Sequence, residues 1–250
     1  MMTNTKKGSG KTDPGHGLAR VISKLGATSR SQAVLLIREG KVRVNGQIIK
    51  DPERRTFMNR DIIEIEDQRL IKAHKIYWMM NKPLNVITTR NDPQNRRTVY
   101  DYLPSRNAWV FPVGRLDAQT TGLIIFTNDT ALGEKITNSE YSITKTYEIK
   151  THPPINSFQI NELKKGVLID KNKLALPCEC KVLKENLDGS CLEIKIKEGM
   201  NRQIRKMVEA VGSNVVQLKR VAIGNLKIGN LKMGEIRALN EREIHLLFHI

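Results

Sequence analysis

The chain has 250 residues, which is enough for one large domain or two unequal ones. Its 42 Lys and Arg residues against 26 Asp and Glu give a formal net charge of +16, which favours a polyanionic partner such as nucleic acid. No apolar run approaches the roughly 20 residues of a transmembrane helix, and no secretory signal opens the chain. We therefore expect no membrane partner and a cytoplasmic location.

The three cysteines, Cys178, Cys180 and Cys191, are too few for the disulfide framework of a secreted domain. Cys178 and Cys180 would share one face of a strand, but no second pair or histidine cluster completes a zinc site. We expect buried, reduced thiols and no metal.

The first 66 residues predict a tail and a small module. Residues 1–16 have almost nothing to bury and indicate a disordered basic tail. Between residues 17 and 66, apolar spacing predicts one helix that ends at Gly26 and a second from Ser29 to Gly40. Alternating valines at 42 and 44, an Asn45-Gly46 turn and isoleucines at 62–65 predict a small sheet. Polar residues 67–74 indicate a linker.

Basic side chains surround this module and favour contacts with phosphate over a merely solvated surface. The expected RNA-binding residues of the module are Arg20, Lys24, Arg30, Arg38, Lys41 and Arg43.

Residues 75–250 form the larger part of the chain. A strand is expected at 76–80, and a polar loop at 89–97 offers Arg90, Arg96 and Arg97, which we expect to lie on RNA rather than in solvent. Half-polar strands at 145–149 and 192–196 alternate with helical segments near 131–136, 155–165, 204–211 and 240–247. The pattern predicts an α+β fold, with a mixed or largely antiparallel sheet flanked by helices.

The segment GRLDAQTTGL at residues 114–123 places a carboxylate, Asp117, in a short loop before the buried strand 123–126. A carboxylate held at such a point, with Arg115 two residues away as a countercharge, can stay ionised and act as a nucleophile. The alternative is that Asp117 only caps a turn and Arg115 is solvated.

The helix near 204–211 carries Arg202, Arg205 and Lys206 opposite its apolar stripe. These residues either make a wet basic face or supply one arginine that turns inward to a carboxylate.

Two resemblances join these segments. ATSR at 27–30 and IREGKVRVNG at 37–46 resemble the S-four RNA-binding domain. NKP at 81–83, the segment at 114–123, KTY at 145–147 and NRQIRKM at 201–207 occur in the order of the RsuA-like pseudouridine synthases, which modify ribosomal RNA. The C-terminal pattern of that family is similar to Leu226, Gly234, Arg237, Leu239 and Glu243. Two positions depart from it: Asn85 stands where glycine is usual, and Met200 where arginine is commoner.

The resemblance implies that Asp117 is the catalytic nucleophile, that Tyr147 stacks on the target base, and that Arg205 pairs with Asp117. We also expect Lys82, Arg115, Arg202 and Lys206 to contact RNA. Isomerisation of uridine to pseudouridine requires no nucleotide cofactor or metal. Whether Asp117 attacks the sugar or the base is left open.

The expected function is therefore the formation of pseudouridine at one uridine of ribosomal RNA. The overall style of the motifs favours RNA of the large subunit. We expect the protein to be a monomer. The alternatives are a non-catalytic RNA-binding protein of ribosome assembly and a basic DNA-binding protein.

Overall fold

The structure is a computed structural model that describes residues 15–104, 109–170, 173–186 and 188–248. The chain divides into two compact units, residues 1–75 and 76–250. Most of the predicted tail, residues 1–14, lies outside the described residues. Within the described part, no helix is long and apolar enough to cross a membrane.

The first unit packs two helices against a small sheet, as its apolar spacing predicts. Helix α1 (Leu18–Lys24) ends at Gly26, which takes a φ of +81°, and helix α2 (Arg30–Arg38) begins where the Ser29 hydroxyl accepts from Gln32 N at 3.0 Å. The sheet has the order β3-β2-β5-β6 and β1 pairs with β4. The strands are β1 (His16–Gly17), β2 (Val42–Val44), β3 (Gln47–Ile48), β4 (Arg55–Thr56), β5 (Ile63–Ile65) and β6 (Gln68–Arg69).

Two boundaries of this unit differ from the sequence prediction. His16 belongs to β1, opposite Thr56, although it was assigned to the tail. Gln68 and Arg69 form β6 on the edge of the sheet, although they were assigned to the linker. Both strands have two residues and no apolar alternation. They are defined only by backbone pairing, so no side-chain pattern in the sequence predicts them.

The second unit is built on a nine-stranded, mostly antiparallel sheet with the order β13-β14-β10-β15-β9-β7-β17, where β16 pairs with β15 and β8 with β9. A separate hairpin pairs β11 with β12. Its strands are β7 (Tyr77–Lys82), β8 (Phe111–Pro112), β9 (Thr121–Thr127), β10 (Lys145–His152), β11 (Leu168–Asp170), β12 (Lys173–Leu174), β13 (Glu179–Asn186), β14 (Gly189–Ile196), β15 (Asn214–Ile223), β16 (Leu226–Lys227) and β17 (Ile236–Ala238). The helices are α3 (Thr130–Thr137), α4 (Ser157–Lys165), α5 (Gln203–Ala210) and α6 (Glu241–Phe248), with 3-10 turns η1 (Val99–Tyr102) and η2 (Ser139–Tyr141).

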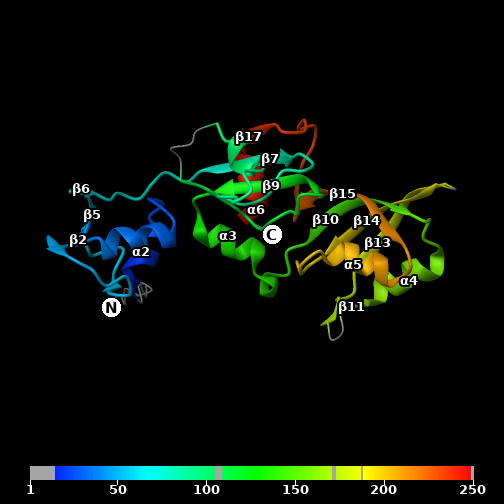
Figure 1. Ribbon diagram of the computed structural model, residues 1–250, viewed down its shortest axis with the longest axis horizontal. Helices are drawn as coiled ribbons and strands as arrows, with labels where there is room; N and C mark the ends of the chain where they lie inside the picture. The colour runs from blue at the N-terminus through cyan, green and yellow to red at the C-terminus, as the bar shows by residue number, and fades with distance from the viewer. Residues whose placement is uncertain (1–14, 105–108, 171–172, 187, 249–250) are drawn as a thin grey trace, which may run out of the picture. The chain divides into compact units, whose positions relative to one another are not determined.

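Different helices cover different stretches of this sheet (Figure 1). Helices α4 and α5 pack on strands β10, β13, β14 and β15 through one apolar cluster, in which Leu163 and Met207 are fully buried. Helices α3 and α6 pack with β7 and β9 in a second cluster. A third cluster joins Met80 and Phe126 of those strands to Val86, Val99 and Val110. The α+β fold expected from the sequence is thus confirmed.

One pair of neighbouring strands at the centre of the sheet is parallel. Strand β15 runs parallel to β9, with Arg220 opposite Gly122. A Cβ at Gly122, whose φ is +104°, would collide with the backbone of Arg220. Glycine there permits the close approach that brings the segment after Asp117 onto the edge of β15.

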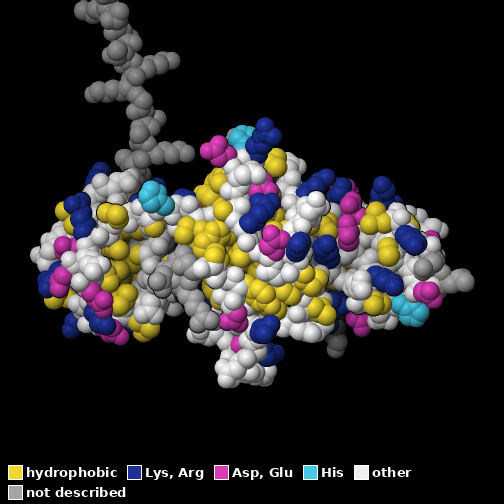
Figure 2. Space-filling model, turned by 90° about the horizontal axis from the view of Figure 1, so that it is seen from above, with side chains coloured by type: hydrophobic (Ala, Val, Ile, Leu, Met, Phe, Trp, Pro, Cys, Tyr) yellow, Lys and Arg dark blue, Asp and Glu magenta, His cyan; other side chains and the backbone are white. Residues whose placement is uncertain are grey.

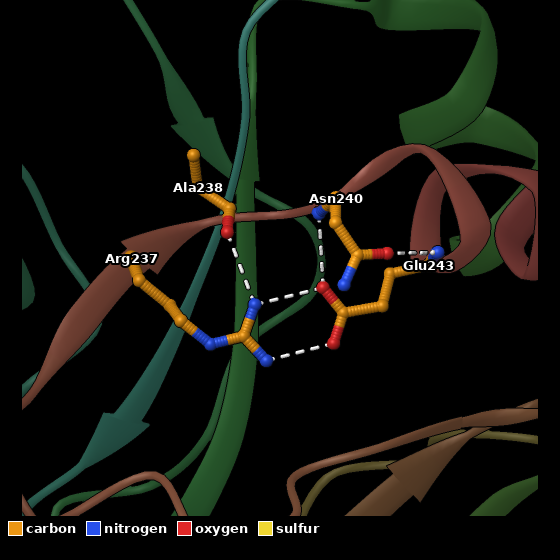
Figure 3. Close-up of polar contacts among 4 residues, drawn as sticks. All are labelled: Arg237, Ala238, Asn240 and Glu243. Atoms are coloured by element: carbon orange, nitrogen blue, oxygen red, sulfur yellow. Dashed lines mark hydrogen bonds and ion pairs between the residues drawn. The ribbon is translucent and has the colours of Figure 1, made fainter.

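The last helix begins as its sequence predicts. The Asn240 side-chain oxygen accepts from Glu243 N, and a Glu243 carboxylate oxygen accepts from Asn240 N, which is a capping box. Arg237 of β17 donates both guanidinium ends to Glu243 at 2.7 Å, as Figure 3 shows. The ion pair ties the strand to the helix that follows it. Residues 228–232 nearly repeat the sequence of residues 223–227, but they form no strand.

Candidate active site

The loop that carries Asp117 lies between β8 and β9 and is held from both sides. Thr88 Oγ1 donates to Leu116 O at 2.7 Å and accepts from Leu116 N at 3.2 Å. Asn85 N donates to Ala118 O at 2.8 Å, and Thr120 N closes the turn onto Asp117 O at 3.0 Å. Asn85 takes a φ of +61°, the left-handed geometry that asparagine was expected to tolerate in place of glycine.

Lys82 reinforces the same loop from inside the protein. Its side chain is 0% exposed, and Nζ donates to Thr120 O at 2.8 Å, to Pro83 O at 2.9 Å and to Ala118 O at 3.5 Å. Burial lowers the pKa of this ammonium to about 8, and the nearby charge of Asp117 opposes that shift. The predicted contact of Lys82 with RNA gains no support from the structure, because the side chain reaches no solvent and its donors are used by the loop.

A pocket of about 440 Å³ opens beside this loop, a size typical of small-molecule sites. Asp117 and Arg115 line it from the loop, Tyr147 from β10, and Arg202 from the start of α5. Asp117 is exposed, so the expected partial burial of its carboxylate is not observed. The carboxylate faces a cavity open to solvent, which a substrate has to close.

Tyr147 is half-buried on the sheet floor of the pocket. It pairs with Ile194 on one side and with Arg220 on the other, and its ring packs against the cluster under α4 and α5. Two neighbouring strands and this packing restrict its rotamer, so the ring is set as a fixed wall of the cavity.

Arg205 lies on α5 and reaches the Asp117 loop without touching the Asp117 carboxylate. Nη2 donates to Gln119 O at 2.7 Å, and Nη1 donates to Val215 O at 3.0 Å. Burial, then the charge of Arg202, lower the pKa of Arg205, and the negative charge of Asp117 raises it. Among the described residues, no hydrogen bond or ion pair joins Arg205 to Asp117, so the expected direct pairing is not made; Arg205 acts on Asp117 through the loop and through space.

Two pocket residues were missed by the sequence reading. Lys145 and Arg220, on β10 and β15, are 9% and 4% exposed and line the pocket beside Tyr147. Each belongs to a strand of alternating residues, and nothing local distinguishes an inward cation from an outward one. Only the register of β10 against β15 brings them together.

The remaining basic residues of the second unit differ in what they contact. Arg115 and Arg202 are exposed where they line the pocket. Lys206 is paired with Asp170 at 2.9 Å, and Arg96 with Asp92 at 2.8 Å. In the loop 89–97, Arg90 lies 5.1 Å above the ring of Tyr100, and Arg97 is exposed.

In the first unit, several expected RNA-binding cations have protein partners. Arg30 pairs with Glu53 at 3.1 Å and Lys41 with both Glu39 and Glu66. Arg43 pairs with Asp67 at 3.3 Å, Lys24 lies 2.7 Å from a ring nitrogen of His16, and Arg20 and Arg38 are exposed. Exposed pairs of this kind contribute little to stability, so a phosphate can replace the acidic partner at small cost.

One face of the molecule is seen in Figure 2, where Lys and Arg side chains are interspersed with acidic and apolar ones. The net charge of +16 is therefore not displayed there as a single continuous patch.

Among the described residues, no group of three or more His, Cys, Asp or Glu side chains could hold a metal ion. Cys178 and Cys180 are free and buried, as expected, whereas Cys191 is free and only partly buried.

The fold and the pocket can now be compared with known proteins. Residues 76–210 match the family model described as RNA pseudouridylate synthase, and residues 17–55 match the S4 domain. The chain belongs to the RNA pseudouridine synthases, which are isomerases of uridine in RNA, and carries an S4 domain before the catalytic unit. The RsuA-like resemblance seen in the sequence is confirmed.

Three relatives cover nearly the whole chain. The ribosomal large subunit pseudouridine synthase B of Bacillus subtilis is 33% identical over 234 residues, which is 92% of this chain and 94% of that protein. An RNA pseudouridine synthase of Aquifex aeolicus is 32% identical, with 92% of each chain covered. A crystal structure of a pseudouridylate synthase superposes with a TM-score of 0.68 at 29% identity and covers 92% of this chain and 99% of that one.

Proposed function

We propose that this chain converts one uridine of large-subunit ribosomal RNA to pseudouridine, with Asp117 as the nucleophile. The observation that carries the proposal is that Asp117 and Tyr147, which are 30 positions apart in sequence, line one pocket of nucleotide size. The choice of RNA is supported by the names of the relatives in Bacillus subtilis and in Buchnera aphidicola, both ribosomal large subunit pseudouridine synthases B.

A base inside a duplex cannot reach this pocket, so the target uridine has to leave the stack before it reacts. Tyr147 then offers a ring face to the flipped uracil, and the exposed Arg115 and Arg202 meet the flanking phosphates. The closed pocket would exclude water from Asp117.

The carboxylate forms a bond to the nucleotide, at C1′ of the ribose or at C6 of the ring, and the bond between C1′ and N1 breaks. The uracil turns, C5 bonds to C1′, the carboxylate is released, C5 loses its proton and N1 gains one. Reactant and product are isomers. Arg205 keeps the loop and its carboxylate in place through Gln119 O.

The first unit supplies affinity in this proposal. Its S4 domain presents cations on α1, α2 and β2, and such phosphate contacts position a protein on RNA without reading the sequence.

The test is pseudouridine mapping of ribosomal RNA from cells that contain or lack this chain. We expect one pseudouridine to disappear on deletion and to return with the wild-type gene but not with Asp117→Asn. The same variant should bind the RNA fragment around the target with a Kd within about twofold of wild type, because removing one charge at the pocket leaves the other phosphate contacts in place.

An unchanged map would refute the proposed activity and leave ribosome assembly as the function. If Asp117→Asn restored the pseudouridine, Asp117 would not be the nucleophile. Competition by duplex DNA at equal salt addresses the DNA-binding alternative, because salt-dependent affinity alone does not distinguish the two polymers.

A further inference from the structure

Arg220 has a buried donor that the protein leaves unused. Its side chain is 4% exposed on β15, and Nε donates to Leu123 O at 2.7 Å. Nη2 is buried and has no hydrogen-bond partner. A buried donor atom without a partner costs stability, so each one in a native structure needs an explanation.

The position of Arg220 directs it to the pocket that holds Asp117. Arg220 pairs with Tyr147 across β10 and β15, so the two side chains leave adjacent strands at the same level and both line the pocket. The ring that is proposed to stack on uracil therefore has a guanidinium beside it.

A second cation shares this floor. Lys145 lies two residues before Tyr147 on β10, on the same face of the strand, and is 9% exposed. Burial, and then the charge of Arg220, lower the pKa of Lys145, which places the two cations near each other.

The acidic groups of the pocket do not neutralise this pair. Glu198 lines the pocket but accepts hydrogen bonds from Leu176 N and from the Gln203 side chain. Asp117 lines it from the loop, and no hydrogen bond or ion pair links it to either cation among the described residues. Within the described part of the chain, Arg220 and Lys145 thus have no hydrogen bond or ion pair to an acidic side chain of the pocket.

The anion that fits is the reacting base and not a backbone phosphate. When a nucleotide is flipped out, its phosphates stay at the protein surface, where the exposed Arg115 and Arg202 can bind them. A group as buried as Arg220, beside the ring of Tyr147, is reached only by what enters the pocket.

We propose that Arg220, assisted by Lys145, is a catalytic residue that donates to a carbonyl oxygen of the target uracil and stabilises the negative charge that develops there. If the carboxylate attacks C1′, the electron pair of the C1′–N1 bond moves into the ring and spreads over O2 and O4. If it attacks C6, the electrons of the C5–C6 double bond move to O4. Both routes place the charge on the ring oxygens, so this role does not depend on the point of attack; it does rest on the proposed function.

The test uses single-turnover rates on two RNA substrates that differ only at the target, one with uridine and one with 5-fluorouridine, each measured as loss of the N-glycoside. Fluorine withdraws electrons and stabilises the ring charge itself, so the enzyme has less to supply. For Arg220→Gln we expect a loss of about 100-fold with uridine and only about tenfold with 5-fluorouridine, at unchanged RNA Kd. Arg220→Lys should lie between Arg220→Gln and wild type.

Lys219→Gln is the matched control. It removes one positive charge from the adjacent position of β15, on the opposite face, and should change neither rate by more than about twofold. Turnover of uridine by the wild type tests the proposed function separately. The proposed role of Arg220 is tested only by the ratio of the rate loss with uridine to the rate loss with 5-fluorouridine.

Equal losses on both substrates would overturn the proposal, because a purely structural defect would lower both single-turnover rates by the same factor. A loss confined to RNA Kd would overturn it too and assign Arg220 to phosphate. If Arg220→Gln does not fold by circular dichroism, the ratio is read from Arg220→Lys and from Lys145→Met, and equal losses in these variants count against it in the same way.

Discussion

At the scale of the residue, two cations lie near Asp117 but make no direct contact with its carboxylate. Lys82 and Arg205 both lie near enough for the charge of Asp117 to affect their pKa values, yet both donate to backbone carbonyls instead. A carboxylate in a direct, bidentate ion pair has its lone pairs occupied. Two cations hold the loop through its backbone and leave the Asp117 oxygens available for a substrate.

The first prediction concerns the buried ammonium of Lys82. Its pKa of about 8 is below the ordinary 10.5, so between these pH values the unfolded chain binds one more proton than the folded chain. Stability therefore rises with pH across that window, by up to about 3 kcal/mol from this group. Lys82→Met removes this gain.

Both tryptophans, Trp78 and Trp109, lie in residues 76–250, so their fluorescence follows the catalytic unit in urea unfolding. We expect the free energy of unfolding of the wild type, relative to Lys82→Met, to be larger at pH 10 than at pH 7.5. A difference that stays constant with pH would show that Lys82 is not perturbed.

At the scale of the element, helix α6 shows how a short helix is fixed to a sheet. Its capping box joins Asn240 and Glu243, and the same carboxylate receives both guanidinium ends of Arg237 from β17 (Figure 3). Leu247, fully buried, anchors the other end of α6 in the cluster with β7 and β9. The spacing of Arg237, Asn240 and Glu243 in the sequence thus allows one carboxylate to join the strand to the helix.

The second prediction is that Glu243→Gln destabilises the catalytic unit by about 1 kcal/mol at pH 7. Arg237 and the cap hold the pKa of Glu243 below its ordinary 4.5. The contribution is therefore present above pH 4.5 and is lost as pH falls through the lowered pKa. In urea unfolding, the gap between wild type and variant should close at acid pH.

Glu241→Gln serves as the control for this prediction, since Glu241 is an exposed acid in the same first turn. It should change stability by less than about 0.5 kcal/mol. A gap for Glu243→Gln that persists unchanged below its lowered pKa would contradict the assignment of its origin to charge.

At the scale of the whole molecule, the two units divide the work that the net charge of +16 suggests. Each unit has its own apolar core, with α1 and α2 in residues 1–75 and the nine-stranded sheet in residues 76–250. In the first unit, Lys and Arg are twice as numerous as Asp and Glu. We infer that this unit supplies affinity for RNA while the second supplies the chemistry.

The third prediction follows from counterion release. A protein that covers fewer phosphates shows a shallower fall of log affinity with log salt concentration. Residues 76–250 expressed alone should bind the target RNA more weakly and with a smaller salt slope than the full chain. At saturating RNA, the single-turnover rate should stay within about tenfold of the full chain. An unchanged slope would show that residues 1–75 do not contact the RNA.

The sequence by itself determined the elements and the order of the motifs. Periodicity is a local property, so the strand at 121–127, the helix at 203–210 and the cap at Asn240 were predictable from their own residues. The resemblance to the RsuA-like family implied that Asp117 and Tyr147 share one site, and both line the pocket.

Only the tertiary structure decided which cations face inward. Lys82 finds its carbonyl at Thr120, 38 residues away, and Arg220 finds Leu123 at a separation of 97 residues. Both contacts depend on strand register, and a shift of one residue would turn the side chain to the opposite face. A lysine or arginine in an alternating strand is expected to be exposed until its neighbours are placed, and for that reason the sequence did not predict the burial of Lys82 and Arg220.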